Sequence, residues 1–485
     1  MCVSWVRPGR WGDVEAIPLS GSGHEGLAWF FGRAAAVPFK AKARNSPQVQ
    51  DYYADFARIA DILHEIFPEL IESTLAAQQL IAPIGANPGE RYFGAFDGIR
   101  ALAACMVFID HYGGLPYWGH GVSIFFVLSG FLITGVLYDA QDTLRRFRTF
   151  YIRRSLRIFP VYYAFWFALL LLTPLLNVQW NRVNLLYVVY AGNHIWGFFS
   201  GPPQDHLEWV HIFIQPFSFV GKVHSWFPLY TGHFWTLAVE EQFYLVWPLV
   251  VFNVRSRVKL IRICVTAIAV LFVARVVAVL WLPEHINLIT HITILRCDEF
   301  LLGGFAALVL RGKRAKTLLR RGWLLFAAGA AGVAVSCTIC YHIGLRSELH
   351  EMQWCFTVQT AMFDVLALGG ILLAMQEKTW LARGLSWRPL RALGRISYGF
   401  YVFHDIPHTL YDRAVSMLAD RTPFEFNEQM VVAVLAFGCT IVMAMLSYRF
   451  IESPFLRMKN KWAPGTKPGR GKPVIEAEPE TVLVA

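Results

Sequence analysis

The chain has 485 residues, of which 55% are hydrophobic and only 16% are charged. Soluble domains carry about 25% charged residues, so this composition excludes an ordinary soluble protein, and the apolar fraction excludes a disordered chain. The net charge of +10 does not indicate nucleic-acid binding, because the basic residues form short clusters between apolar stretches, as in the cytoplasmic loops of membrane proteins. The composition therefore predicts an all-α polytopic membrane protein.

Residues 1–90 are predicted to form a cytoplasmic N-terminal extension without a cleavable signal peptide, because they lack a continuous apolar core. From Asp51 to about Leu75 the apolar residues follow helical spacing and the opposite face is acidic, which predicts an amphipathic helix. An acidic face disfavours anionic lipid. The helix either packs locally or docks on the protein's own cytoplasmic loops or on a second copy, which would give a homo-oligomer.

The membrane domain is predicted to span residues 91–458, and residues 459–485 a basic-then-acidic cytoplasmic tail. Its apolar stretches are each near the ~20 residues that a bilayer crossing needs. They are residues 96–112, 121–138, 151–173, 235–252, 258–282, 293–310, 322–343, 355–376, 396–418 and 429–451.

Lys and Arg gather in the loops 139–157, 253–262, 311–321 and 377–395, whereas the alternate loops are nearly free of them. Because positive loops stay inside, the sequence predicts about ten transmembrane helices with both termini cytoplasmic. The short apolar stretch 184–199 then lies between two outside loops and is predicted to be re-entrant or interfacial.

The first span carries ionisable residues, whose insertion into lipid costs free energy and therefore indicates a functional or structural role. Arg100 and His111 are eleven residues apart, which is ~16 Å along a helix with an angular offset of about 20°, so both lie on one face. Asp97 and Asp110 flank the pair. The alternative is that Arg100 snorkels towards water and that His111 ends the helix.

Further ionisable residues lie in four other regions of the membrane domain. Arg153, Arg154 and Arg157 open the third span, where planar guanidinium groups suit phosphate, although plain positive-inside signalling would also explain them. The remainder are Glu240 and Glu241 in the fourth span, Arg296, Asp298 and Glu299 in the span 293–310, and His404 and Asp405 in the ninth. Arg296 can simply form a structural ion pair with one of its neighbours, and His404 can be a core histidine.

Together these residues predict an arginine-lined cytoplasmic mouth and a deeper site with a histidine and a carboxylate. Such a site suits a large anionic donor from the cytosol and proton transfer by a histidine within the membrane. A proton-coupled transporter could use the same groups, and the residues alone leave both readings open.

The sequence blocks around these residues resemble the acyltransferase 3 family, whose members are membrane proteins that acylate carbohydrates. The resemblance covers about residues 93–456. Its blocks, in order, are FDGIRALAACMVFIDH, GVSIFFVLSGFLITGVL, FYIRRSLRIFPVYY, FWTLAVEEQFYLVWPL, LRCDEFLLGG, LGRISYGFYVFHDIP and YRFIESPF. A departure is Ser123, where the family often has Asp, and the long N-terminal extension is atypical.

By position, the family's functional residues fall on Arg100, His111, Arg154, Arg157 and Glu240. The resemblance implies that His111 is the general base and that the three arginines hold the phosphates of acyl-CoA. It implies that Glu240 orients His111 or the acceptor. No metal is implied. An acyl-histidine intermediate stays open beside direct transfer.

The resemblance therefore implies an enzyme of the cell inner (plasma) membrane that transfers an acyl group, most simply acetyl, from cytosolic acyl-CoA to a carbohydrate or glycolipid hydroxyl. The predicted acceptor contacts include Trp209 and Trp226, because the outer loop 199–234 is rich in aromatic and polar side chains. The others are Asn193, which the stretch 184–199 would bring towards the same chamber, and His404 in the ninth span. An ordinary interfacial aromatic belt would explain the aromatic residues equally. The alternative function is a transporter or flippase for a glycan or lipid, although the sequence contains no clear inverted repeat.

Overall fold

The computed structural model describes residues 93–113, 118–180, 183–195, 211–214, 227–339, 353–421 and 427–463. The chain divides into two compact units, residues 1–82 and 83–485, and the described residues all belong to the second. The predicted N-terminal helix and the tail after residue 463 lie outside the described residues.

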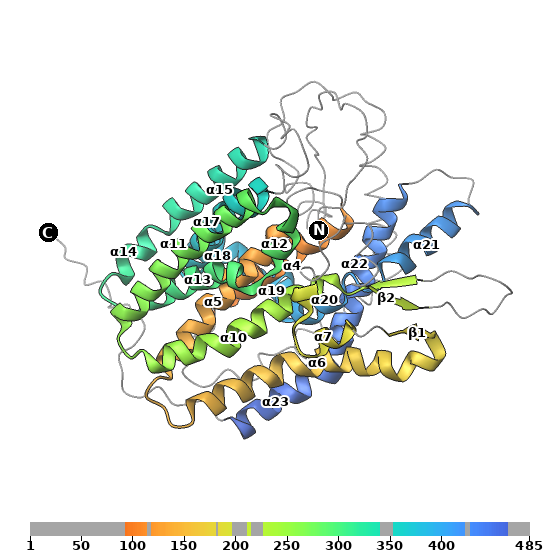
Figure 1. Ribbon diagram of the computed structural model, residues 1–485, viewed down its shortest axis with the longest axis horizontal. Helices are drawn as coiled ribbons and strands as arrows, with labels where there is room; N and C mark the ends of the chain where they lie inside the picture. The colour runs from red at the N-terminus through yellow and green to blue at the C-terminus, as the bar shows by residue number, and fades with distance from the viewer. Residues whose placement is uncertain are drawn as a thin grey trace. The chain divides into compact units, whose positions relative to one another are not determined.

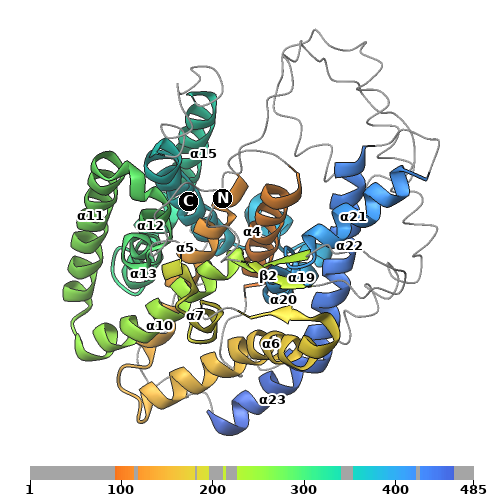
Figure 2. The same cartoon turned by 45° about the vertical axis from the view of Figure 1, so that its right-hand side comes forward.

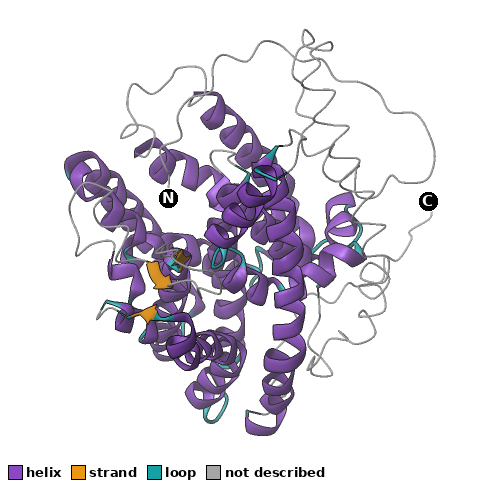
Figure 3. Ribbon diagram, turned by 90° about the vertical axis from the view of Figure 1, so that its right-hand side faces the viewer, coloured by secondary structure: helices purple, strands orange, loops and turns teal. Residues whose placement is uncertain are grey.

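The described part of the chain is mostly helical, as predicted (Figure 1, Figure 3). The longer helices are α4 (Gly94–Tyr112), α5 (Gly121–Asp139), α6 (Arg146–Leu176), α10 (Trp235–Asn253), α11 (Arg257–Trp281), α13 (Cys297–Val309), α15 (Gly322–Ile339), α17 (Thr360–Ala374), α21 (His408–Ala419), α22 (Glu428–Ser447) and α23 (Ser453–Trp462). Shorter α-helices are α7 (Asn184–Val188), α12 (Ile286–His291), α14 (Ala315–Arg320), α18 (Trp380–Leu385), α19 (Arg388–Arg395) and α20 (Ser397–Phe403). The 3₁₀ turns are η1 (Trp118–His120), η2 (Gly192–His194), η4 (Gly232–Phe234), η5 (Pro283–His285) and η6 (Thr293–Arg296), and the π-helical segments are η8 (Cys355–Gln359) and η9 (Tyr448–Glu452).

Among the described residues, six helical segments are long and apolar enough to cross a membrane. They are Gly121–Asp139, Arg146–Leu176, Arg257–Trp281, Gly322–Ile339, Cys355–Ala374 and Glu428–Lys459, which match six of the predicted spans. The other four predicted spans fall on helices that are shorter or richer in polar residues. For example, α4 carries Asp97, Arg100 and Asp110 within its 19 residues.

The predicted ninth span, residues 396–418, is not one helix but two. Helix α20 ends at Phe403, a turn follows, and α21 begins at His408. Pro407 has no amide hydrogen and disfavours helical geometry in the residue before it, so the helix breaks here. The break places His404 and Asp405 in a turn between two helices.

Close helix contacts in the membrane domain depend on glycine. Helices α5 and α13 pack against each other along much of their length. A side chain at Gly130 would overlap the carbonyl of Phe300, and one at Gly303 would overlap the backbone of Val127. Small residues of this kind let two backbones approach closely, which is how helices in lipid gain packing energy.

A buried ionic cluster joins α11 to α13. Arg275 binds Asp298 with two contacts, Nη2 to Oδ2 at 2.8 Å and Nη1 to Oδ1 at 2.9 Å. Arg296 contacts Glu299 at 2.9 Å. The prediction of a structural ion pair is therefore confirmed, and Arg275 adds a partner from a second helix.

A small antiparallel sheet lies beside the helices and was not predicted. It has the order β1 (Val178–Gln179), β2 (His211–Ile214) and β3 (Phe227–Tyr230), with His211 opposite Tyr230. β3 is tied to the break between α20 and α21, because the Tyr230 amide donates to the Ile406 carbonyl at 3.2 Å and Thr409 donates to the Pro228 carbonyl at 2.8 Å. The views in Figure 1 and Figure 2 both show β2 near α20.

Candidate active site

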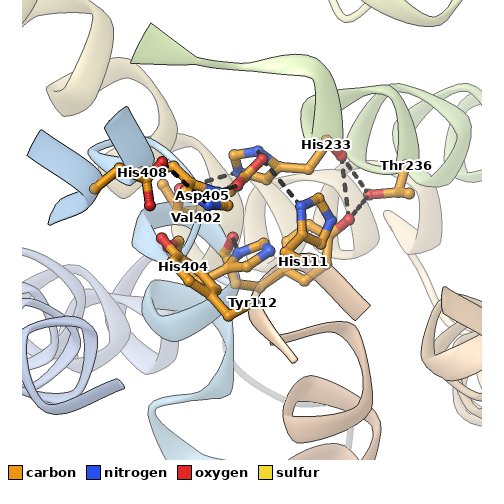
Figure 4. Close-up of polar contacts among 10 residues, drawn as sticks. His111, Tyr112, His233, Thr236, Val402, His404, Asp405 and His408 are labelled. Carbon is orange, nitrogen blue, oxygen red and sulfur yellow. Dashed lines mark hydrogen bonds and ion pairs between the residues drawn. The ribbon is translucent and has the colours of Figure 1, made fainter. Parts of the chain in front are cut away.

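The His111 ring and the Asp405 carboxylate are in direct contact between α4 and the break after α20 (Figure 4). The His111 Nδ1 atom lies 3.1 Å from Asp405 Oδ2, and the histidine side chain is 21% exposed whereas the carboxylate is buried. A carboxylate only accepts hydrogen bonds, so Nδ1 carries the hydrogen. The other ring nitrogen, Nε2, is then free to accept a proton, which is the arrangement of a histidine base held by a carboxylate.

Three more histidines surround the same carboxylate (Figure 4). His408 Nδ1 lies 3.0 Å from Asp405 Oδ1, and His233 Nδ1 lies 3.9 Å from Oδ2. The His404 ring is fully buried, and its centre is 4.9 Å from the His111 ring and 4.8 Å from the His233 ring. We call these four histidines and Asp405 the histidine cluster.

The hydrogen bonds of His404 and His233 define which of their ring nitrogens carry hydrogen. His404 Nδ1 donates to the Tyr401 carbonyl at 2.7 Å, and His233 Nε2 donates to the Val402 carbonyl at 3.1 Å. His404 Nε2 is buried and has no hydrogen-bond partner among the described residues. It is an acceptor available to a hydroxyl that reaches the cluster.

Polar side chains continue along α10 from the histidine cluster. His233 precedes the helix, and Thr236 contacts the Tyr401 hydroxyl. One turn on, Glu240 Oε1 accepts hydrogen bonds from Ser129 at 2.6 Å and from Tyr244 at 3.1 Å. Helix α10 therefore connects the cluster to a second polar region deeper in the bundle.

The predicted arginines gather at the far end of this polar row. The Arg154 guanidinium stacks over the Tyr244 ring at 4.1 Å, and Arg157 lies within electrostatic range of both Arg154 and Arg100. Arg100 is held at 2.8 Å by Asp97, one turn away on α4. Like charges repel, so a group of three arginines favours an anion nearby.

The structure brings most of the predicted catalytic and donor residues to these two regions. Within the described residues, the carboxylate that contacts His111 is Asp405, whereas Glu240 contacts Ser129 and Tyr244. The His404 ring lies beside the His111 ring. Trp209 and Trp226 lie outside the described residues.

Asn193 belongs to a different network. Its Nδ2 donates to the His291 carbonyl and to Thr293, both at 3.1 Å, and its Oδ1 accepts from Gln242 at 2.9 Å. The side chain is completely buried, so its polar atoms are occupied by the protein.

Sequence reasoning missed His233 and His408, and it gave Asp405 no role. A usable signal was present for His233, because His111 and His233 both lie at or next to the predicted outer end of a span. In the described part of the chain, no group of three or more His, Cys, Asp or Glu side chains is arranged to hold a metal ion.

Comparison with known proteins identifies the family of the chain. A family model described as an acyltransferase domain matches residues 93–449. Relatives include "Putative peptidoglycan O-acetyltransferase YrhL" of Bacillus subtilis, 31% identical over 378 residues, which is 75% of this chain and 55% of that protein. Peptidoglycan O-acetyltransferase OatA of Listeria monocytogenes is 28% identical over 381 residues, and O-acetyltransferase OatA of Staphylococcus aureus is 26% identical over 377 residues.

Both OatA matches cover 75% of this chain, and they cover 56% of the Listeria protein and 57% of the Staphylococcus protein. The chain thus spans little more than half the length of the curated relatives it matches. No solved structure matches the chain. The match over residues 93–449 includes α4, which carries Arg100 and His111, and the break that carries Asp405. The chain therefore belongs to the acyltransferase 3 family.

Proposed function

We propose that this protein is a membrane O-acetyltransferase that moves an acetyl group from cytosolic acetyl-CoA to a hydroxyl of a peptidoglycan-type glycan. The observation that carries the proposal is the contact of the Asp405 carboxylate with His111, which lies on the same helix as Arg100. The peptidoglycan O-acetyltransferases among its relatives support the choice of acceptor.

The chemistry follows from the tautomer of His111. Its free Nε2 takes the proton of the acceptor hydroxyl while the oxygen attacks the thioester carbonyl. The carbon–sulfur bond breaks, and the departing thiolate takes the proton back from His111. Asp405 holds the ring in the required tautomer and stabilises the imidazolium that forms in between. Orienting His111 is thus assigned to Asp405, and Glu240 keeps the alternative role of orienting the acceptor.

The donor's phosphates would bind Arg100, Arg154 and Arg157. Guanidinium groups form charge-assisted and often bidentate hydrogen bonds with phosphate. Arg100 lies eleven residues from His111 on α4, which is ~16 Å in a helix. A phosphate group and a thioester at opposite ends of one extended donor molecule suit this separation.

The acceptor would approach from the side of the sheet. The link between β3 and the turn that carries Asp405 supports a role of the outer loop next to the histidine cluster. In this proposal His404 Nε2 accepts a hydrogen bond from the glycan, and Trp209 and Trp226 stack on its sugar rings. Asn193 supports the neighbouring backbone in place of a direct contact.

We further propose that the protein lies in the plasma membrane, crosses it ten times and has both termini in the cytoplasm. The six apolar helices support a multi-pass arrangement. Residues 1–90 would form a cytoplasmic extension whose acidic helix docks on the cytoplasmic loops or on a second copy, and residues 459–485 a cytoplasmic tail.

An assay of CoA release tests the proposed function. The purified protein is given acetyl-CoA with and without soluble glycan fragments, and the free CoA is measured. We expect release to depend on the glycan and acetyl groups to appear on it by mass spectrometry. A protein that moves glycan across vesicles without releasing CoA would be a transporter and would overturn the proposal.

A further inference from the structure

Three tyrosines, Tyr162, Tyr163 and Tyr190, pack together where α6 meets the turn after α7, and Tyr398 also bonds to the backbone of α6. The Tyr162 ring stacks on the Tyr190 ring with centroids 4.3 Å apart. Tyr162, Tyr163 and Tyr398 each donate their hydroxyl to a backbone carbonyl, of Tyr187, Val188 and Ile158, at 2.6, 3.0 and 2.7 Å. The Tyr190 hydroxyl is buried and has no partner among the described residues.

The backbone at Tyr190 is also unusual. Its φ of 54° lies in the left-handed region, which is strained for a bulky residue and is often kept at functional sites. Gln242 stabilises this geometry, because its Nε2 donates both to the Tyr190 carbonyl at 2.8 Å and to Asn193 Oδ1 at 2.9 Å. The buried network of Asn193 thus maintains a strained turn that carries an unpaired phenol.

Glu241 on α10 is a complementary unpaired group. Its Oε1 atom is buried without a hydrogen-bond partner in the described part of the chain. Its charge lies within electrostatic range of Tyr190 and of Arg154. Buried polar atoms normally have partners, so a buried phenol donor and a buried carboxylate acceptor that both lack one indicate a missing ligand or water.

The position of this pair along α10 selects the ligand. Glu241 lies between Thr236, beside the histidine cluster, and Tyr244, beneath Arg154. Along the axis of α10, Glu241 is therefore at a level between the proposed reacting centre and the proposed phosphate contacts. A second phosphate does not suit the site, because the Glu241 carboxylate would repel it.

We propose that Tyr190 and Glu241 bind an amide of the acyl donor, with the Tyr190 hydroxyl donating to the amide carbonyl and Glu241 accepting from the amide N–H. This proposal rests on the proposed function and narrows the donor to acyl thioesters of a pantetheine arm, which carries two amides. Donors without an amide, such as acyl phosphates, would lack this contact.

A series of acetyl thioesters tests the proposal in the purified full-length protein, with thiol release as the common readout. The series consists of acetyl-CoA, S-acetylpantetheine with two amides, S-acetyl-N-acetylcysteamine with one, and S-acetylmercaptoethanol with none. Tyr190→Phe keeps the ring stack and removes the hydroxyl. We expect it to lower kcat/KM about tenfold for acetyl-CoA and S-acetylpantetheine, as for one lost hydrogen bond, and to leave the amide-free thioester unchanged. The one-amide thioester shows which amide is bound.

Tyr163→Phe is the matched control, because it removes a hydroxyl of the same aromatic group that already has a backbone partner. It should show no dependence on the donor's amides. Glu241→Met, which removes the acceptor, should reproduce the pattern of Tyr190→Phe, and Glu241→Gln, which keeps an amide oxygen, should retain most activity.

Two results would overturn the assignment: an equal loss of kcat/KM with all four thioesters in Tyr190→Phe, or full activity of that variant with acetyl-CoA. Either result would mean that the site is structural or holds water. Failure of the proposed function looks different, since the wild-type protein would then release no thiol from any donor.

Discussion

Asp405 binds two histidine side chains at hydrogen-bond distance, so a single buried carboxylate organises both His111 and His408. Asp405→Asn removes the charge that stabilises a protonated His111. We expect kcat to fall by ~10²–10⁴-fold, about as much as for His111→Ala, because His111→Ala removes the general base and Asp405→Asn removes the group that holds its tautomer. Asp412→Asn, at an exposed carboxylate 3.8 Å from His408, is the control and should stay near wild type. Wild-type turnover in Asp405→Asn would show that a group other than Asp405 orients His111.

Arg154 and Arg157 lie in the region assigned to the donor's phosphates. The double change Arg154→Ala and Arg157→Ala should weaken CoA binding at least tenfold in calorimetry, because charge-assisted hydrogen bonds are lost. Lysine replacements should restore only part of the affinity, since an ammonium lacks the planar fork. Arg153→Ala provides a control on the same helix, as Arg153 contacts the Ala463 carbonyl at 3.4 Å. Unchanged CoA affinity in the double variant would place the phosphates elsewhere.

The contact between helices α5 and α13 depends on Gly130, whose added Cβ would overlap the carbonyl of Phe300. Gly130→Ala should destabilise the protein by about 1–3 kcal/mol, the usual cost of overpacking, and lower its midpoint of thermal unfolding in detergent. Gly438→Ala on α22 is the control, because no atom lies within 4 Å of its added Cβ. A Gly130→Ala variant as stable as Gly438→Ala would mean that the two helices are not in close contact.

The sequence predicted the elements with strong local signals and missed those that depend on tertiary contacts. Helix α4 follows its predicted span closely, so Arg100 and His111 do share one face. Pro407 was visible in the sequence, yet an apolar run on both sides suggested one span in place of α20 and α21. The partnership of Asp405 with His111 joins residues 294 positions apart. No spacing rule could identify it.

At the scale of the whole molecule, the ten-span topology makes a prediction that needs no activity assay. In a background without native cysteines, Lys316→Cys within the basic loop 311–321 should react only with reagents that enter the cytoplasm. Asp420→Cys, after α21, should react with an impermeant reagent added to intact cells. Both positions are exposed, so accessibility to the reagent reports the side of the membrane. Labelling of Lys316→Cys from outside would refute the topology.

The pairing of Arg275 with Asp298 has a consequence for how the chain is inserted during synthesis. An unpaired arginine or aspartate within a span costs ~2.5–3.5 kcal/mol on insertion scales, so α11 and α13 each enter lipid at a disadvantage when alone. Only residues 282–296 separate the two helices, and α13 therefore leaves the ribosome soon after α11. We expect the insertion machinery to retain α11 until α13 arrives and to release the two together as a neutralised hairpin.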